Sequence, residues 1–259
     1  PEEKPSEIAA CEPYFIGSHS GASGAWVSGP EDLQTDGTKN DYFWGYAQMA
    51  TTPGVFCAGD ASGASSHKFS SGSFTEGRIA AKAALKYVLE HADEPQVDEA
   101  QVAELKAAIL KPLDLFEQHK AASTDPDINP NYLRPKMAMF RLQKIMDEYA
   151  GGVSTHFKTS KENLERGLEL LDMLKEDFAN LGASDLHELL RCWESVHRTW
   201  QAEAHIRTIL YREETRWPGY YYRSDFNTMK DDWKVFVNTR WNPETGEWEM
   251  SKKPIHQIF

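Results

Sequence analysis

Four runs of apolar residues at helical spacing constrain the fold of this chain more than any other sequence feature. The runs are Val97–His119, Leu133–Tyr149, a run from near Thr159 to Gly182, and a long run that reaches about Arg216. In each run, apolar residues recur every three or four positions and therefore share one face of a helix. Pro, Gly or polar residues separate the runs, as short loops separate packed helices. Residues 94–216 are therefore predicted to form a bundle of three or four helices.

Several residues in these runs have the character of helix breakers or caps. Pro112 is expected to kink or stop the first helix, because it lacks a backbone N–H. Thr159 and Glu162 have the spacing of a capping box. Ser184 or Asp185 is expected to cap the last helix.

Residues 1–93 differ in composition, being rich in Gly, Ser and aromatic residues. Short apolar runs at Tyr14–Ile16 and Val55–Ala58 have the character of strands between turns. Phe74–Ala92 has the apolar spacing and the alanine content of a helix that packs closely.

Residues 217–259 form an aromatic tail, in which the stretch 235–250 reads as a β-hairpin. Asn-Pro-Glu-Thr-Gly supplies the turn, and Trp241 and Trp248 are placed for a cross-strand contact. Such a tail docks either on its own chain or on a partner, and the sequence leaves both open. The whole is predicted to be an α+β protein: an α/β remnant with a capping region, a helical bundle, and an extended tail with a hairpin.

Composition excludes several classes of function. A net charge of −12 argues against a nucleic-acid surface, which needs clustered Lys and Arg. Apolar runs fall short of the roughly 20 residues of a membrane span, and the N-terminus is no signal peptide. Three scattered cysteines, Cys11, Cys57 and Cys192, indicate a reduced, cytoplasmic protein. The His residues of the bundle lack paired carboxylates, so no metal site is expected.

The stretch "GVFCAGDASG" directs attention to Asp60, which follows a strand-like run and Gly59. A carboxylate at the end of such a strand accepts hydrogen bonds from sugar hydroxyls readily. Ser71, Gly72, Ser73 and Phe74 then lead into a helix expected to begin near residue 75, whose N-terminal dipole favours an electron-rich group. Together these residues predict a cradle for a cofactor.

These segments resemble the C-terminal flavin-binding segment of the fumarate reductase and succinate dehydrogenase flavoprotein superfamily. Its members have Gly-Leu-Tyr-Ala-Ala-Gly-Glu, a loop with His, and Gly-Asn-Ser-Leu opening a helix that contains Gly-Arg. The resemblance implies FAD as cofactor, with Asp60 holding ribityl or ribose hydroxyls. It also implies that the backbone of Ser73 and Phe74 meets the pyrimidine edge of the flavin.

Two further segments extend the resemblance. "GSHSGASGAW" is similar to the superfamily's His-Tyr-x-x-Gly-Gly, with Ser23 in place of the first Gly, and implies that His19 contacts the substrate. An imidazole suits that role because it can donate to an anion near neutral pH. The tail echoes a segment of the type Arg-Gly-x-His-x-Arg-x-Asp-Phe through Arg216, Gly219, Arg223, Asp225 and Phe226.

One departure narrows the choice within the superfamily. The loop His67–Gly72 has no Arg to clamp a dicarboxylate. The combined motifs are similar instead to the α subunits of the adenylylsulfate reductases. That resemblance implies reduction of adenosine 5′-phosphosulfate to sulfite and AMP, or the reverse, through a flavin–sulfite adduct, with Phe69 available to stack on adenine. It implies an iron–sulfur β subunit holding the 4Fe–4S clusters, since three scattered Cys cannot ligate one.

The GxGxxG fingerprint that holds the FAD pyrophosphate is missing from these 259 residues. We therefore expect the chain to be the C-terminal part of a larger flavoprotein, with the N-terminal part as partner, and not to bind FAD tightly alone. Two other functions are compatible with the sequence: a fumarate reductase-like flavoprotein acting on a dicarboxylate or amino acid, and a non-catalytic helical interaction module.

Overall fold

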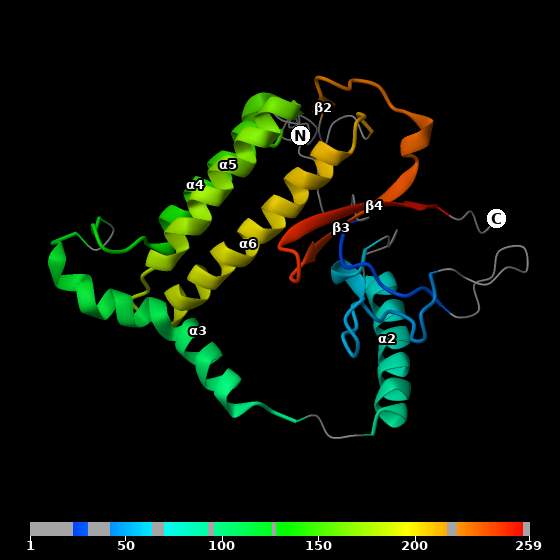
Figure 1. The fold of residues 1–259 in the computed structure, drawn as a ribbon, viewed down its shortest axis with the longest axis horizontal. Helices are drawn as coiled ribbons and strands as arrows, with labels where there is room; N and C mark the ends of the chain where they lie inside the picture. Colours follow the sequence, from blue (N-terminus) through cyan, green and yellow to red (C-terminus); the bar gives the residue numbers. More distant parts are fainter. Residues whose placement is uncertain are drawn as a thin grey trace, which may run out of the picture. The chain divides into compact units, whose positions relative to one another are not determined.

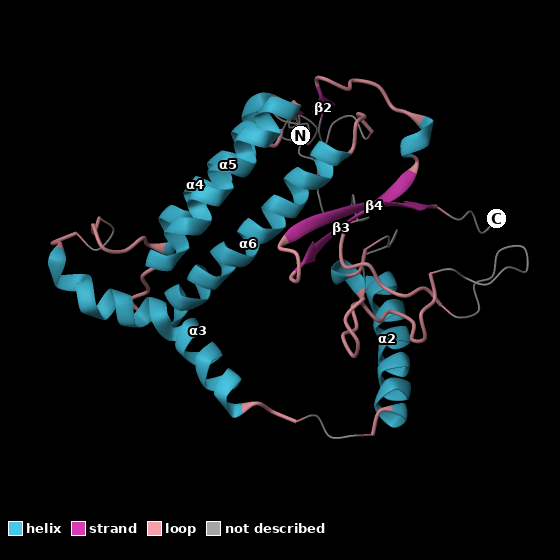
Figure 2. Ribbon diagram, in the orientation of Figure 1, coloured by secondary structure: helices cyan, strands magenta, loops and turns pink. Residues whose placement is uncertain are grey.

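The computed structural model describes residues 23–30, 42–63, 70–92, 96–125, 128–216 and 222–255 (Figure 1). The chain divides into two compact units, one of residues 1–95 with 254–259 and one of residues 96–253. Helices and strands are mixed within the chain, as predicted for an α+β protein (Figure 2). The predicted strand Tyr14–Ile16 lies outside the described residues.

One long helix, α2 (Ser70–Glu90), dominates the first unit. It begins about five residues earlier than predicted, so the Ser-Ser-Gly-Ser stretch forms its first turn instead of a loop before it. Serine is tolerated there because the first backbone N–H groups of a helix have no intrahelical partner in any case. Ala80 is its buried residue, while Leu85, Val88 and Leu89 are exposed in this chain.

The rest of the first unit is held by isolated bridges between short extended segments. Val27 pairs with Ala50, and Met49 pairs with Phe56, both antiparallel. Of the predicted strand Val55–Ala58, the structure has the single bridge at Phe56.

Three helices form the bundle of the second unit: α4 (Pro135–Tyr149), α5 (Lys161–Asp177) and α6 (Leu186–Tyr211). They lie side by side in Figure 1, and each packs against the other two. The predicted periodicity is confirmed in part: most of the apolar residues at helical spacing lie in or against the core, whereas Met137 and Phe140 are exposed. The fully buried members of the core are Ala138, Leu164, Leu171, Leu174 and Ile206.

A fourth helix, α3 (Glu99–His119), packs on α6. Pro112 lies inside α3 and neither stops the helix nor exposes its carbonyl, which accepts from the backbone N–H of Ala183 at 2.9 Å. The indole N–H of Trp193 donates to the carbonyl of Ile109 at 3.1 Å. These two hydrogen bonds attach the proline-containing turn to the start of α6.

Polar side chains cap the helix starts, as the sequence predicted in part. Asp185 caps α6 by accepting from the backbone N–H of Glu188 at 2.9 Å, which confirms one of the two expected caps. The predicted capping residue of α5 is wrong: Ser160 caps it, accepting from the N–H of Asn163. Thr159 lies in a strand, and its hydroxyl donates to the carbonyl of Tyr149 at 2.6 Å.

Helix α6 ends at Tyr211, five residues before the predicted end at Arg216. Its last carbonyls accept from the buried guanidinium of Arg223, with Nη1 2.6 Å from the Ile209 oxygen. Arg223 belongs to β2 (Tyr222–Arg223), which pairs in parallel with β1 (Lys158–Thr159). A distant side chain thus closes the helix that periodicity alone would extend.

The predicted hairpin is confirmed as β3 (Val235–Asn242) and β4 (Glu247–Pro254). The rings of Trp241 and Trp248 meet across it at 5.7 Å between centroids. The indole N–H of Trp248 donates to the buried carboxylate of Glu203 on α6 at 2.8 Å, so this part of the tail docks on its own chain. Short 3₁₀ turns complete the described chain: η2 (Gly59–Ala61), η3 (Lys120–Ala122), η4 (Val153–Thr155), η5 (Phe178–Asn180) and η6 (Asp231–Trp233).

Candidate functional site

The turn η2 presents Asp60 on the surface of the first unit. Gly59 is buried with φ of +63°, a left-handed conformation that glycine adopts without a steric cost. A Cβ atom on Gly59 would lie 2.9 Å from the hydroxyl oxygen of Ser73 in α2. The backbone of η2 therefore packs closely on the first turn of α2, while Asp60 itself is exposed.

Glu76 of α2 holds both ends of this turn. Its Oε2 atom accepts from the backbone N–H of Gly59 at 2.7 Å and from the hydroxyl of Ser62 at 2.9 Å. Ser62 is 1% exposed, and its backbone N–H donates to the carbonyl of Gly59 at 3.0 Å. The carboxylate thus fixes the turn from which Asp60 projects.

The segment that follows His19 lies directly beside the same turn. Ala25 forms a parallel bridge with Ser62, donating to the Ala61 carbonyl at 2.8 Å and accepting from the N–H of Gly63 at 2.7 Å. A Cβ atom on Gly24 would lie 2.6 Å from the carbonyl carbon of Ser62. Only a residue without a side chain allows these two backbones to approach so closely.

The N-terminal turn of α2 completes the arrangement. Ser71, Gly72 and Ser73 belong to this turn, where a helix dipole favours an electron-rich group. The hydroxyl of Thr75 donates back to the carbonyl of Ser71 at 2.8 Å and reinforces the turn. The side chain of Phe74 is 80% exposed, so this position offers an unburied aromatic surface beside the helix start.

The structure brings together the residues predicted for the cofactor, whereas the two residues predicted for the substrate lie outside the described part of the chain. Gly59, Asp60, Ser71, Gly72, Ser73 and Phe74 lie on η2 and the start of α2. His19 and Phe69, predicted for substrate binding, lie outside the described residues. Their roles stay predictions.

Sequence reasoning missed Glu76, although the signal was available. Glu76 lies three residues after Ser73, and residues three apart share a helix face. With the helix begun at Ser70, that spacing directs Glu76 toward the same turn as Ser73. The prediction began the helix five residues later and therefore did not consider Glu76.

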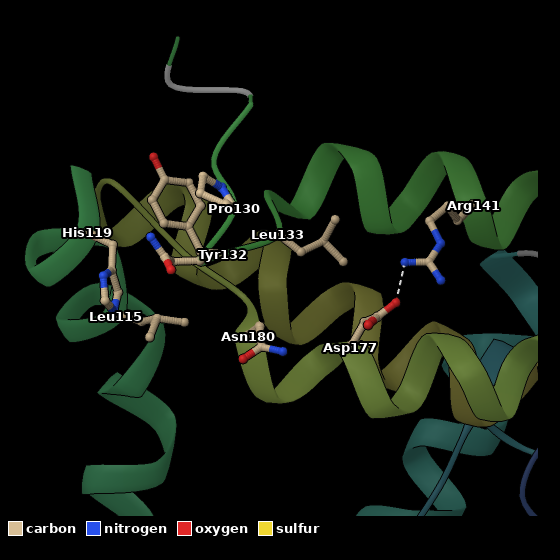
Figure 3. A pocket seen from close by; sticks show the side chains of 9 residues that line it. Leu115, His119, Pro130, Tyr132, Leu133, Arg141, Asp177 and Asn180 are labelled. Atoms are coloured by element: carbon tan, nitrogen blue, oxygen red, sulfur yellow. Dashed lines mark hydrogen bonds and ion pairs between the residues drawn. The ribbon is translucent and has the colours of Figure 1, made fainter. Parts of the chain in front are cut away.

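The second unit contains a cavity of about 510 Å³ (Figure 3). It is lined by Leu115, His119, Pro130, Asn131, Tyr132, Leu133, Arg141, Asp177 and Asn180. Figure 3 shows the side chains of Arg141 and Asp177 pointing toward one another, and they form an ion pair at 2.5 Å. Of the predicted residues that the structure describes, none lines it.

The described residues hold no group of three or more His, Cys, Asp or Glu side chains suited to a metal ion. Among the described helices, none is long and apolar enough to cross a membrane. Cys192 is 1% exposed and packs in the core of the bundle, and burial raises the pKa of its thiol to about 12.

Comparisons with known proteins show what the chain is similar to in sequence and fold. A family model described as the fumarate reductase flavoprotein C-terminal region matches residues 139–258. The chain is 47% identical, over its whole length, to the adenylylsulfate reductase subunit alpha of Megalodesulfovibrio gigas and covers 40% of that protein. It spans well under half the length of that relative.

Solved structures give the same result. The adenylylsulfate reductase of Archaeoglobus fulgidus is 51% identical with a TM-score of 0.86, over 95% of this chain and 38% of that one. An adenosine-5-phosphosulfate reductase in complex with sulfite, as a covalent adduct, matches with the same identity, coverage and TM-score. Sdh1 of Mycobacterium smegmatis, at 21% identity and a TM-score of 0.61 over 83% of this chain and 34% of that one, shares the fold. Residues 139–258 thus match the fumarate reductase flavoprotein C-terminal model, and the whole chain is similar to part of an adenylylsulfate reductase alpha subunit.

Proposed function

We propose that this chain is the C-terminal part of the FAD-containing subunit of an adenylylsulfate reductase. The enzyme would reduce adenosine 5′-phosphosulfate to sulfite and AMP, or catalyse the reverse. The observation that carries the proposal is the 47–51% identity to adenylylsulfate reductases over nearly the entire chain, including both segments that meet at η2. The fumarate-type alternative is not favoured, since its relatives are only 17–22% identical.

The residues at η2 fit the sugar chain of FAD. The exposed carboxylate of Asp60 can accept from ribityl or ribose hydroxyls. Gly24 and Gly59 carry no side chain, which lets the segment at residue 24 and the start of α2 pack closely against the turn that carries Asp60. The N-terminal turn of α2 suits the electron-rich pyrimidine edge of the flavin. FAD, when bound, supplies the electrons that reduce the substrate sulfur.

Two residues outside the described ranges complete the proposed substrate site. His19 would donate to the sulfate and phosphate oxygens of the substrate, because a protonated or neutral imidazole can serve as donor. Phe69 would stack on the adenine ring, for which an aromatic face contributes roughly 1–3 kcal/mol per base.

The exposed apolar surface of α2 supports a larger assembly. Leu85, Val88 and Leu89 are 61%, 63% and 72% exposed in this chain, which is unusual for one face of a helix in a soluble domain. We propose that the N-terminal part of the same flavoprotein covers them and supplies the FAD pyrophosphate site. An iron–sulfur β subunit with 4Fe–4S clusters would deliver the electrons. The free Cys57 and Cys192 are consistent with a reducing, cytoplasmic location.

The test uses the complete flavoprotein together with its iron–sulfur partner. Formation of AMP and sulfite from adenosine 5′-phosphosulfate should exceed any reduction of fumarate by orders of magnitude. Replacing His19 by Ala should lower the rate strongly, whereas His187→Ala, a histidine at the start of α6, serves as the matched control. Equal activity on fumarate would refute the proposed substrate. An unchanged rate after His19→Ala would refute the role of that residue.

A further inference from the structure

We propose that Glu76 is a positioning residue for the FAD site, and the inference rests on the proposed function. Its carboxylate would orient Asp60 toward the cofactor and align the segment that follows His19. The residue acts through hydrogen bonds to backbone and hydroxyl groups, without contact to the cofactor.

The first step is the hold on Gly59. The peptide N–H of Gly59 donates to Oε2 of Glu76 at 2.7 Å, and Asp60 is the next residue along the chain. Gly59 adopts a left-handed conformation here, and in an unrestrained loop a glycine would sample many other conformations. A charged acceptor on a rigid helix restricts that freedom, because charge-assisted hydrogen bonds are shorter and stronger than neutral ones.

The second step is the hold on Ser62 by the same oxygen. The Ser62 hydroxyl donates to Oε2 at 2.9 Å, which closes η2 at its far end. Both ends of the turn are thus bound to one oxygen atom of α2. This fixes the direction in which Asp60, which lies between them, projects. Ser62 is 1% exposed, so water does not replace this bond readily.

The third step links Glu76 to the substrate side. Ser62 forms the parallel bridge with Ala25. The backbone of Gly24 lies so close to Ser62 that a Cβ atom on Gly24 would not fit between them. The placement of residues 23–27 therefore depends on the position of Ser62. A single carboxylate thus connects the turn of Asp60 with residues 23–27, which follow His19 in the sequence.

Variants of the complete flavoprotein test this role by their FAD dissociation constants, measured from flavin fluorescence on titration. Glu76→Ala should weaken FAD binding by about 10- to 100-fold, since hydrogen bonds to a charged group contribute about 1.5–3 kcal/mol. Glu76→Gln keeps an acceptor oxygen of the same reach and should rescue binding to within a few-fold of the parent. Glu90→Ala is the matched control, because it removes another α2 carboxylate that holds a side chain, the Tyr46 hydroxyl at 2.5 Å.

The outcomes separate the two proposals. No FAD binding by the parent flavoprotein would refute the proposed function. Binding by the parent and equally by Glu76→Ala would overturn the positioning role alone. If the role of Glu76 were purely structural, FAD affinity would follow the thermal unfolding midpoint. Equal FAD affinities of Glu76→Ala and Glu90→Ala at equal midpoints would therefore also overturn the positioning role. If Glu76→Ala does not fold, Ser62→Ala decides: a loss of about tenfold supports the role and an unchanged constant refutes it.

Discussion

Replacing Arg223 by Ala should destabilise the helical bundle more than any surface substitution. Arg223 is 1% exposed, binds the end of α6 directly and is linked to the start of α5 through Asp225. Its Nη1 donates to the carbonyls of Ile209, Leu210 and Arg212 at the end of α6, at 2.6, 3.2 and 3.1 Å. Its Nε and Nη2 form a fork on Asp225 at 2.9 and 2.7 Å. Asp225 in turn accepts from the N–H of Lys161 at the start of α5.

The magnitude follows from what the substitution leaves unpaired. Removing one partner of a buried ion pair costs about 3–5 kcal/mol, and buried carbonyls without donors add to the penalty. Because Asp225 keeps 28% of its side chain exposed, water can compensate part of the loss, and we expect about 3–4 kcal/mol. Arg223→Lys retains the charge but not the fork and should cost about 1–3 kcal/mol.

The assay follows Cys192, which lies in the bundle core and reports this unit alone. In a background with Cys11 and Cys57 replaced by Ser, labelling of Cys192 by a thiol reagent across a urea series gives the free energy of opening. The control is Arg166→Ala, an exposed pair with Glu169 expected to contribute 0–1 kcal/mol. A loss below about 1 kcal/mol for Arg223→Ala, close to the control, would refute the reasoning.

The same pair predicts an acid dependence of the bundle. The hydrogen bonds from Arg223 lower the pKa of Asp225, burial opposes them, and the Lys161 N–H adds to the lowering. A carboxyl whose folded pKa is depressed stabilises the fold above its unfolded pKa, about 3.9, and loses this as the pH falls through the folded value. Below about pH 4 the parent should therefore lose stability more steeply than Asp225→Asn. Parallel pH profiles would contradict the assignment.

Three further outcomes follow from the contacts described. Gly24→Ala should weaken FAD binding by the complete flavoprotein by roughly tenfold, because its Cβ atom would meet the Ser62 backbone, as a fluorescence titration can check. Trp248→Phe should cost about 1.5–3 kcal/mol in urea unfolding through the lost bond to Glu203; a change within error would mean that this bond does not hold the hairpin. With its pKa near 12, Cys192 should react with a thiol reagent at about pH 8 only as fast as the bundle opens, and immediate labelling of the native chain would refute its burial.

The sequence predicted those features that short-range chemistry determines. Core positions at helical spacing identified α4, α5 and α6, since residues such as Leu164 and Leu171 must face the same side. Asp185 was predictable as a cap because its acceptor reaches the N–H three residues ahead. The hairpin followed from turn residues whose bonds are local, such as the Asn242 side chain accepting from the N–H of Glu244.

The features that were mispredicted depend on residues far apart in the chain. Thr159 and Ser160 are equally able to cap α5, and the pairing of β1 with residues more than sixty positions later decides for Ser160. The end of α6 depends on Arg223 in the same way. At the site, the sequence identified Asp60 but not Glu76, because a carboxylate that holds a turn has no motif of its own.

The clamp of Arg223 and Asp225 has a consequence for synthesis of the chain. All three bundle helices precede it in sequence, so they leave the ribosome before the residues that close the ends of α5 and α6. Until then, the last carbonyls of α6 and the first N–H of α5 have only water as partner. Because a domain leaves the ribosome from its N-terminal end, α5 and α6 would each lack hydrogen-bond partners at one end during part of synthesis. Truncation before residue 223 should yield a bundle of native helix content that chaperones and proteases recognise as unfinished.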